Sequence, residues 1–230
     1  MHYVDGYAFD DLTFAISYMR WLRLIKNKTA EDIFSVVMNL NIKHYLYFYS
    51  LFFSYNKKAI ESKIHKANDP KFAFLFYKDI KCNKSKMKNI ILNSNNSKYI
   101  IRLAELDNSL VQTAFNTVLK NKNPSSALIL MKKFNIKSDK MLKIVLKSNK
   151  PRHLLSLSKI TSDKNILSKI EKKLLKINHF RYLTYFAANN ISYNIEKIEK
   201  SIKKHGDYED ALFFAKKVKR SKLNELLLFV

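Results

Sequence analysis

The chain has 230 residues, of which 43 are Lys or Arg and 19 are Asp or Glu, giving a formal net charge of +24 at pH 7. It contains only two glycines, three prolines and one cysteine. So few turn-forming residues disfavour sheets with tight turns and glycine-rich phosphate loops. A single cysteine excludes an internal disulfide and a multi-cysteine zinc site. Long helices joined by short polar turns fit this composition.

The first 40 residues differ in charge from the rest of the chain. They carry four basic and five acidic residues, whereas residues 41–230 carry 39 basic and 14 acidic ones. We expect residues 1–40 to hold N-terminal capping helices and a first repeat beginning near Asp11, and residues 41–230 to form one helical-repeat array. The start shows no basic-then-apolar progression typical of a secretory signal. The longest apolar run, residues 45–53, is too short to span a bilayer.

The prolines indicate a repeat of 27 residues. Pro124 and Pro151 are separated by this distance, and Pro70 precedes Pro124 by twice as much, so Ser97 marks the missing member. Further units are expected to begin at Asn41, His179 and Asp207. An apolar or small residue stands three positions after the proline or its equivalent, which is four positions after the polar residue before it. These residues are Ala73, Ile100, Ala127, Leu154, Leu183 and Ala211.

Each unit has the pattern of two helices. Asp69, Asn123 and Asp207 are good N-caps, and Pro70 and Pro124 stand where the first helical residue needs no N–H group. We expect neighbouring helices to approach closely seven positions after the proline or its equivalent, at Tyr77, Ala104, Met131, Ala187 and Ala215. A polar turn precedes each second helix, whose apolar residues are spaced by three and four, as in Met141, Ile144 and Val145.

One helical hairpin cannot bury both of its apolar stripes, so it must stack on the next hairpin. The sequence therefore predicts an all-α fold: an α-solenoid of about eight helix-turn-helix repeats of 27–30 residues. The chain ends on an apolar run, Leu226–Val230. We expect this run to fold inward against Ile195 and Ile202, and the alternative is that a partner or a second copy of the chain covers it.

The pattern D-P-x-x-A-x-x-x-x-K-x-I-K, seen at residues 69–81 and more loosely at 207–219, resembles short helical repeats in uncharacterised proteins of large DNA viruses and phages. In outline it is also similar to HEAT-type arrays. The resemblance implies a solenoid and a viral origin, and it implies no catalytic residue. The units that begin at Asn96 and His179 depart from the pattern because they lack the proline.

Lysines recur on the side of the second helices opposite the apolar stripe. Stacked units would align them as one basic strip able to neutralise successive phosphates without reading base sequence. The competing interpretation is a solvated lysine face, with lysine enriched by an AT-rich genome. The candidate nucleic-acid-binding residues are Lys140, Lys143, Lys147, Lys169, Lys172, Lys173, Lys176, Lys197, Lys200 and Lys204, with Lys203 beside them.

Other candidate sites are weaker. The many aromatic residues between positions 45 and 77 are interpreted as core, and base stacking is the alternative. Lysines near Cys82 would lower its pKa, but without a His or acid partner we interpret it as an incidental thiol. No cofactor or metal site is expected, because the six histidines are scattered singly. The only acid–aromatic candidate for base excision is Trp21 with Glu31 or Asp32.

Three functions follow, in order of preference. The first is a non-enzymatic scaffold that binds a macromolecular partner, either a host or viral protein or a nucleic acid. The second is sequence-independent binding of DNA or RNA along the lysine strip. The third is a HEAT-like DNA glycosylase. No membrane partner is expected, and the predicted location is intracellular, in the cytoplasm of a host or infected cell or associated with a virion.

Overall fold

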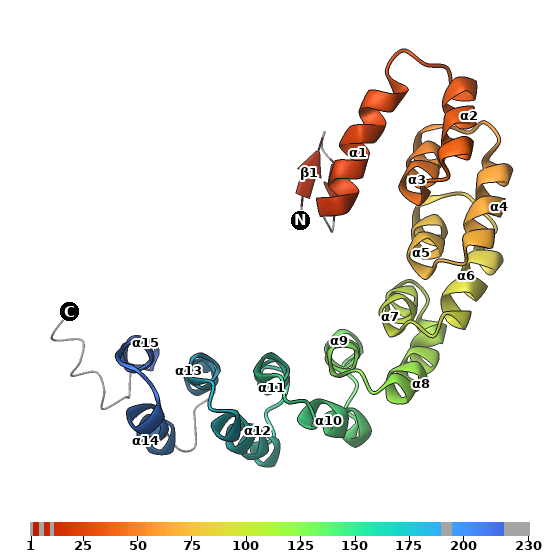
Figure 1. The fold of residues 1–230 in the computed structure, drawn as a ribbon. Helices are drawn as coiled ribbons and strands as arrows, with labels where there is room; N and C mark the ends of the chain where they lie inside the picture. Colours follow the sequence, from red (N-terminus) through yellow and green to blue (C-terminus); the bar gives the residue numbers. More distant parts are fainter. Residues whose placement is uncertain (1, 5–6, 10–11, 190–194, 219–230) are drawn as a thin grey trace. The chain divides into compact units, whose positions relative to one another are not determined.

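The structure, a computed structural model, describes residues 2–4, 7–9, 12–189 and 195–218. Within these residues the protein is an all-α helical-repeat fold of fifteen α-helices, which confirms the fold class predicted from the sequence (Figure 1). The helices alternate between two positions in the repeat. We call the odd-numbered ones first helices and the even-numbered ones second helices.

Two short strands precede the first helix. β1 (His2–Val4) pairs antiparallel with β2 (Tyr7–Phe9), and both strands contact α1 (Leu12–Ile25). This hairpin was not expected from the sequence, which predicted only helices in residues 1–40. Strands of three residues are too short to show a period-two pattern, so the pairing had no sequence signal.

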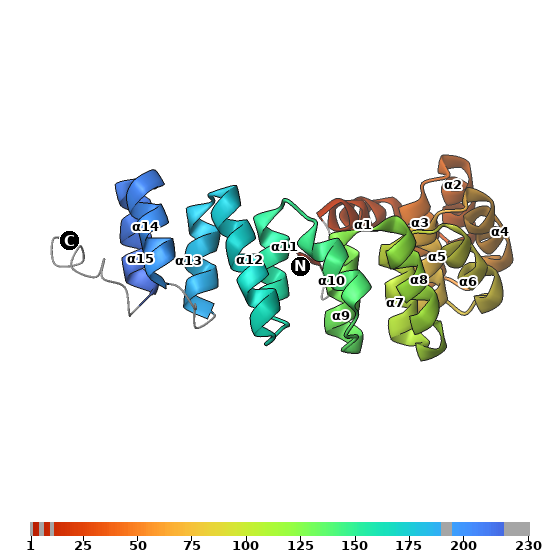
Figure 2. The same cartoon turned by 90° about the horizontal axis from the view of Figure 1, so that it is seen from below.

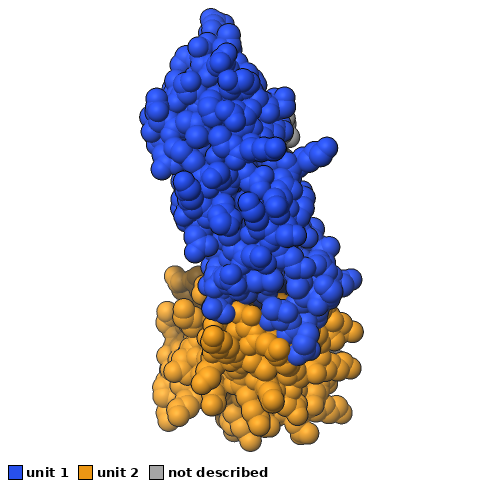
Figure 3. All heavy atoms as spheres, turned by 90° about the vertical axis from the view of Figure 1, so that its right-hand side faces the viewer, with its two compact units in different colours: residues 1–113 blue, residues 114–230 orange. Residues whose placement is uncertain are grey.

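The chain forms two compact units, residues 1–113 and 114–230 (Figure 3). The division falls inside α8 (Val111–Asn121), which follows a short 3₁₀ helix, η1 (Asn108–Leu110). It does not coincide with the division expected between residues 40 and 41, which stays a prediction. The solenoid arrangement of the whole chain also stays a prediction.

In the first unit, consecutive first helices contact one another, and every second helix contacts the first helix that follows it. Each helix pair therefore packs on the next (Figures 1 and 2). The first helices after α1 are α3 (Lys43–Phe52), α5 (Pro70–Asp79) and α7 (Ser97–Leu106). The second helices are α2 (Ala30–Leu40), α4 (Lys57–Ala67) and α6 (Lys84–Asn93).

The second unit repeats this arrangement, with its first helices in one layer and its second helices in another (Figure 1). The first helices are α9 (Pro124–Phe134), α11 (Pro151–Ser158), α13 (Phe180–Asn189) and α15 (Tyr208–Lys217). The second helices that follow α8 are α10 (Asp139–Leu146), α12 (Lys164–Ile177) and α14 (Ile195–His205). The described residues thus contain seven helix pairs and α15. A second helix for the eighth repeat, and the apolar run Leu226–Val230, would lie outside them.

The predicted N-caps are confirmed. The Asp69 carboxylate accepts a hydrogen bond from the Lys71 N–H at 2.9 Å, and Asn123 and Asp207 cap α9 and α15 in the same way. Pro70, Pro124 and Pro151 all stand in the first turn of a helix. The unit expected to begin at Asn41 instead has its helix start at Lys43, 27 residues before Pro70.

Asparagine takes the place of glycine where helices end. Asn41, Asn68, Asn135 and Asn178 are C-caps with φ between 48° and 57°, in the left-handed region. Asparagine is the non-glycine residue that tolerates this conformation best, because its short polar side chain bonds locally to the backbone. This explains how a chain with two glycines can contain so many helix ends.

Two positions of each first helix form its buried seam. Of the six residues predicted three positions after the proline or its equivalent, Ala73, Ile100, Ala127, Leu154 and Leu183 are buried, whereas Ala211 is half-buried. The residue six positions after the start is buried in all seven helices that share this numbering, at Tyr49, Phe76, Leu103, Leu130, Leu157, Phe186 and Phe214.

The prediction that neighbouring helices approach closely seven residues after the start is only partly correct. Ala104, Ala187 and Ala215 are buried there, but Tyr77 and Met131 are half-buried. This position lies at the edge of the seam, so an alanine is covered whereas a longer side chain reaches the surface. The position six residues after the start is the one that faces the neighbouring helices.

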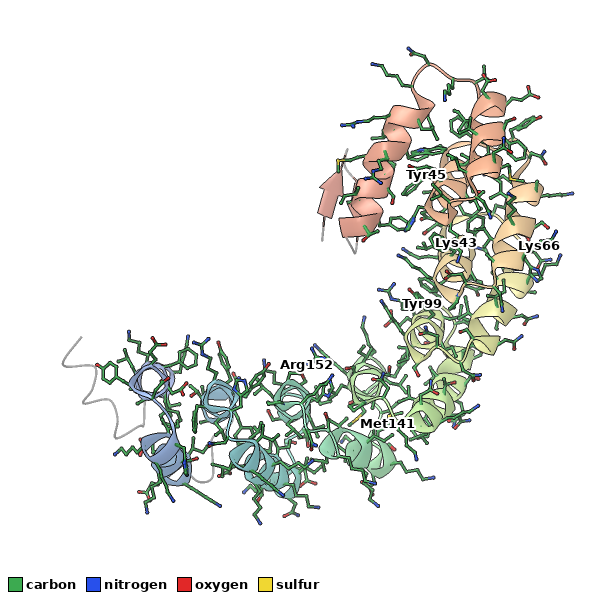
Figure 4. The ribbon with its side chains drawn as sticks, in the orientation of Figure 1. Lys43, Tyr45, Lys66, Tyr99, Met141 and Arg152 are labelled. Atoms are coloured by element: carbon green, nitrogen blue, oxygen red, sulfur yellow. The ribbon has the colours of Figure 1, made fainter. Side chains whose placement is uncertain are left out.

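Each second helix carries a pair of buried apolar residues spaced by four, which defines its inner side. All members of these pairs are at most 1% exposed. The pairs are Ile33 and Val37, Ile60 and Ile64, Met87 and Ile91, Ala114 and Val118, Met141 and Val145, Ile170 and Leu174, and Ile198 and Ile202. Figure 4 shows Met141 between α10 and α9.

The aromatic residues of the first unit are mainly core, as interpreted from the sequence. Trp21, Phe48 and Tyr49 are at most 1% exposed, and the Trp21 ring lies 6.2 Å from the Phe48 ring and 6.5 Å from the Tyr49 ring. Tyr45 lies between α3 and α1, with its ring 6.0 Å from that of Trp21 (Figure 4). These rings therefore join α1 to α3 and are not an exposed stacking platform.

The seam can be tested with two adjacent residues of α9. Leu130→Ala should lower the free energy of unfolding by about 2–5 kcal/mol, because Leu130 is fully buried and its truncation leaves a cavity. Ile129→Ala should change it by no more than about 0.5–1 kcal/mol, because Ile129 is 44% exposed. Urea unfolding followed by circular dichroism measures both. Equal losses for the two variants would contradict the assignment of the seam.

Candidate nucleic-acid interface

Nine of the ten predicted lysines occupy equivalent positions on three successive second helices of the second unit. On each helix, one lysine precedes the first residue of the buried pair, one follows it by two positions, and one follows the second residue of the pair by two. We call these nine residues the lysine lattice. They are Lys140 and Lys143 of α10 with its C-cap Lys147, Lys169, Lys172 and Lys176 of α12, and Lys197, Lys200 and Lys204 of α14.

All nine lattice lysines are exposed. At 100° per residue, the three positions lie on the side of each helix opposite the buried pair, so solvent and not the neighbouring helices surrounds them. Within residues 114–189 and 195–218, no ion pair or hydrogen bond engages the ammonium group of Lys140, Lys143, Lys147, Lys169, Lys172, Lys176, Lys200 or Lys204. Their charge therefore faces outward.

Lys173, the tenth predicted residue, has a different environment and does not belong to the lattice. Its side chain is half-buried, and its Nζ donates hydrogen bonds to the Leu146 carbonyl and, at 3.4 Å, to the Ser148 carbonyl. An ammonium group at this place satisfies carbonyls left without partners at the end of α10. The assignment of Lys173 to a nucleic-acid-binding strip is thus not supported by its geometry.

The first unit contains the same kind of lysine bond. Lys63 of α4 donates to the carbonyl of Met38 near the end of α2, 25 residues earlier. Some lysines of this chain therefore join successive second helices, whereas others face solvent. The sequence alone does not separate them, because both kinds stand in similar lysine-rich helices.

Lysine fills the lattice positions of α10, α12 and α14 but not the equivalent positions of the earlier second helices. The twelve equivalent positions of α2, α4, α6 and α8 hold three lysines among residues of other kinds. They are Asp32, Ser35 and Asn39; Ala59, Ser62 and Lys66; Lys86, Asn89 and Asn93; and Thr113, Asn116 and Lys120. An AT-rich genome would bias the whole chain alike, so it does not explain why lysine fills all nine positions of α10, α12 and α14.

Two buried carboxylates lie at equivalent positions in α12 and α14. Glu171 is 5% exposed and Glu199 is 4% exposed. Burial raises the pKa of the Glu171 carboxyl above its ordinary value, and the nearby charges of Lys197 and Lys172 oppose this rise. Lys197 therefore stabilises a charge beneath the surface as well as contributing to the lattice.

The three residues considered for base excision do not form a common exposed site. Trp21 is fully buried, so its ring cannot stack on an extruded base. The Asp32 carboxylate is part of a capping box with Thr29, and these bonds lower its pKa. Glu31 accepts a hydrogen bond from the Tyr55 hydroxyl at 3.0 Å.

Cys82 differs from the expectation for its lysine-rich turn. Its thiol is half-buried and donates to the Phe76 carbonyl at 3.3 Å. Burial raises the pKa of the Cys82 thiol, and this outweighs the lowering by Lys84. Across the described ranges, no group of three or more His, Cys, Asp or Glu residues could hold a metal ion, and no helix has both the length and the apolar character needed to cross a bilayer.

Comparison with known proteins gave no match to a family model, to a curated protein or to a solved structure. The resemblance to viral and phage helical repeats, and the viral origin that it implies, therefore stay predictions. The site rests on the geometry of this chain alone.

The raised pKa of Glu171 gives a pH-dependent prediction. Above the ordinary glutamate pKa of about 4.3 the carboxyl is ionised in the unfolded chain, so folding must either take up a proton or bury the charge, and both cost free energy. Below this pKa the group is protonated in both states and the cost disappears. Glu171→Gln should therefore raise the melting temperature at pH 7, and the gain should disappear as the pH falls to about 4.

Thermal unfolding measured by circular dichroism across this pH range gives the comparison, with Glu209→Gln as the control because Glu209 is exposed. A gain from Glu171→Gln that persists unchanged at acidic pH would show that burial of the charge is not the cause.

Proposed function

We propose that the protein is a non-enzymatic helical-repeat scaffold whose macromolecular partner is a nucleic acid, held by its phosphate backbone on the lysine lattice. The observation that supports this proposal is the concentration of exposed lysine at all nine equivalent outer positions of α10, α12 and α14. Binding rather than catalysis is proposed because these positions hold only lysine, with no nucleophile or general base among them.

The arrangement of the lattice suits a repeating anionic ligand. On each helix, the first and third lysines are seven positions apart, which corresponds to about 10 Å along the helix axis. Three such rows present ammonium groups at several places of the outer surface, where each can neutralise a phosphate and release a counterion.

The chemistry of lysine also limits what such a surface can read. An ammonium group on a flexible chain is a point charge, and it lacks the planar fork with which arginine recognises a guanine edge. Contacts to phosphates fix the position of a nucleic acid but carry no direct information on its sequence. We therefore expect binding to be independent of base sequence and strongly dependent on salt.

The proposal predicts the behaviour of a variant with Lys143→Gln, Lys172→Gln and Lys200→Gln, which removes one lattice lysine from each helix. Each lost phosphate contact on duplex DNA should reduce the slope of log K against log salt by about 0.9, and the three together by up to about 2.7. Affinity should fall by a similar factor on every sequence. Fluorescence anisotropy with two unrelated duplexes, each at several salt concentrations, measures both effects.

The matched control removes the same charge elsewhere, with Lys26→Gln, Lys28→Gln and Lys66→Gln, all exposed residues of the first unit. It should leave the salt slope close to that of the unmodified protein. Affinity that does not depend on salt, or an equal loss in lattice and control variants, would contradict the proposed role of the lattice.

A further inference from the structure

A groove lies between α9 and α11, in the layer of first helices and away from the lysine lattice. Its volume is about 370 Å3. Its aliphatic lining comes from Leu128 and Ile129 of α9 and from Ile160, just after α11. Ile129 is 44% exposed, so a large part of its side chain is in contact with solvent. The groove therefore offers solvent an apolar surface.

The rim of the groove is cationic. Lys132 of α9, Arg152 of α11 and Lys159 at the end of α11 line it, and all three side chains are exposed. Figure 4 shows Arg152 on the side of α11 that faces away from the second helices. No acidic residue lines the groove. Its electrostatic complement is an anionic ligand with an apolar part.

A buried histidine holds the two walls of the groove together. His153 is 7% exposed, and its ring nitrogens lie 2.9 Å from the Ser125 hydroxyl on α9 and 2.7 Å from the Ser148 hydroxyl before α11. Burial lowers the pKa of the His153 ring, so both bonds are made by a neutral imidazole at pH 7. The separation of α9 and α11 is thereby fixed before a ligand arrives, which reduces the entropic cost of binding.

We propose that this groove binds an extended acidic segment of a partner protein, with one aliphatic side chain of that segment in the groove and its carboxylates at Lys132, Arg152 and Lys159. Charge complementarity selects an acidic ligand, and the guanidinium of Arg152 suits a carboxylate because it can donate two parallel hydrogen bonds. The aliphatic lining selects a side chain such as leucine or isoleucine.

A nucleic acid is a poorer fit for this groove. Single-stranded nucleic acids are held by aromatic rings on which the bases stack, and no aromatic residue lines the groove. The proposed peptide site and the lysine lattice thus differ in ligand and in helix layer. The peptide site does not depend on the nucleic-acid proposal.

The test is a selection of displayed random peptides on the immobilised full chain. The expected consensus is a single aliphatic residue flanked by Asp and Glu. A synthetic consensus peptide, measured by fluorescence anisotropy, should lose about tenfold in affinity or more with Arg152→Glu, which is about 1.4 kcal/mol of binding free energy. Ile129→Ala should also weaken binding, since it removes aliphatic surface without disturbing the seam.

The matched control is Lys143→Glu, which makes the same change of charge sign on α10 and should leave peptide affinity within about twofold of the unmodified protein. Circular dichroism checks folding, and Arg152→Gln replaces Arg152→Glu if the reversal unfolds the chain. The proposal is overturned if no acidic–aliphatic consensus emerges, or if the groove and control variants lose affinity equally. It is also overturned if oligothymidine displaces the peptide and the binding of oligothymidine is lost with Arg152→Gln. Loss of nucleic-acid binding in lattice variants with peptide binding intact would separate the two sites.

Discussion

The structure depends on one constraint: a helix pair of this chain has apolar seams that its own two helices cannot cover. The seam of a first helix includes the fully buried residue six positions after its start, and that of a second helix is a pair of residues spaced by four. Burying one large aliphatic side chain contributes about 1.5–3 kcal/mol, so leaving a seam exposed would cost more than a small hairpin can supply. Within each unit, the next pair provides the missing cover.

This constraint acts on the position of a residue within its helix and not on the length of the repeat. The helices from Lys43 to Pro151 start at intervals of 27 residues, whereas α13 and α15 start after 29 and 28 residues. The residue six positions after the start is buried in all of them, so the connections between helices absorb the difference. The outer positions of the helices take no part in this burial. Those positions can change between repeats without loss of the fold, and in the second unit they hold the lysine lattice and the groove between α9 and α11.

The fold could be predicted from the sequence wherever a rule of local chemistry fixes the residue. Pro70, Pro124 and Pro151 mark helix starts because a proline needs no N–H partner there, and the 27-residue interval located the start at Ser97, which has no proline. Prediction was weaker inside the helices. Positions six and seven after the start lie about 60° and 40° to either side of the buried position three, so both border the apolar stripe. Only the packing of neighbouring helices shows that Phe76 is buried and that Tyr77 is half-buried.

The candidate site could likewise be predicted from the sequence only in part. The outer position of nine lysines follows from helical periodicity, so the sequence located them correctly. Lys173 is only one residue from Lys172, yet its ammonium group reaches a carbonyl at the end of α10, which depends on how α10 and α12 sit together. The environments of Cys82 and His153 also required the structure, because burial determines the first and a partner 28 residues away, Ser125, contributes to the second.

We infer that, within each unit, each helix pair is stabilised by its contacts with neighbouring pairs and not by one common core. Native-state hydrogen exchange of the Phe214→Ala variant tests it most directly, because Phe214 is fully buried in α15 at one end of the second unit. We predict that amides of α15 and α13 lose protection whereas those of α9 and α10 keep theirs. An equal loss of protection in all helices of residues 114–218 would show a single cooperative core and contradict the account.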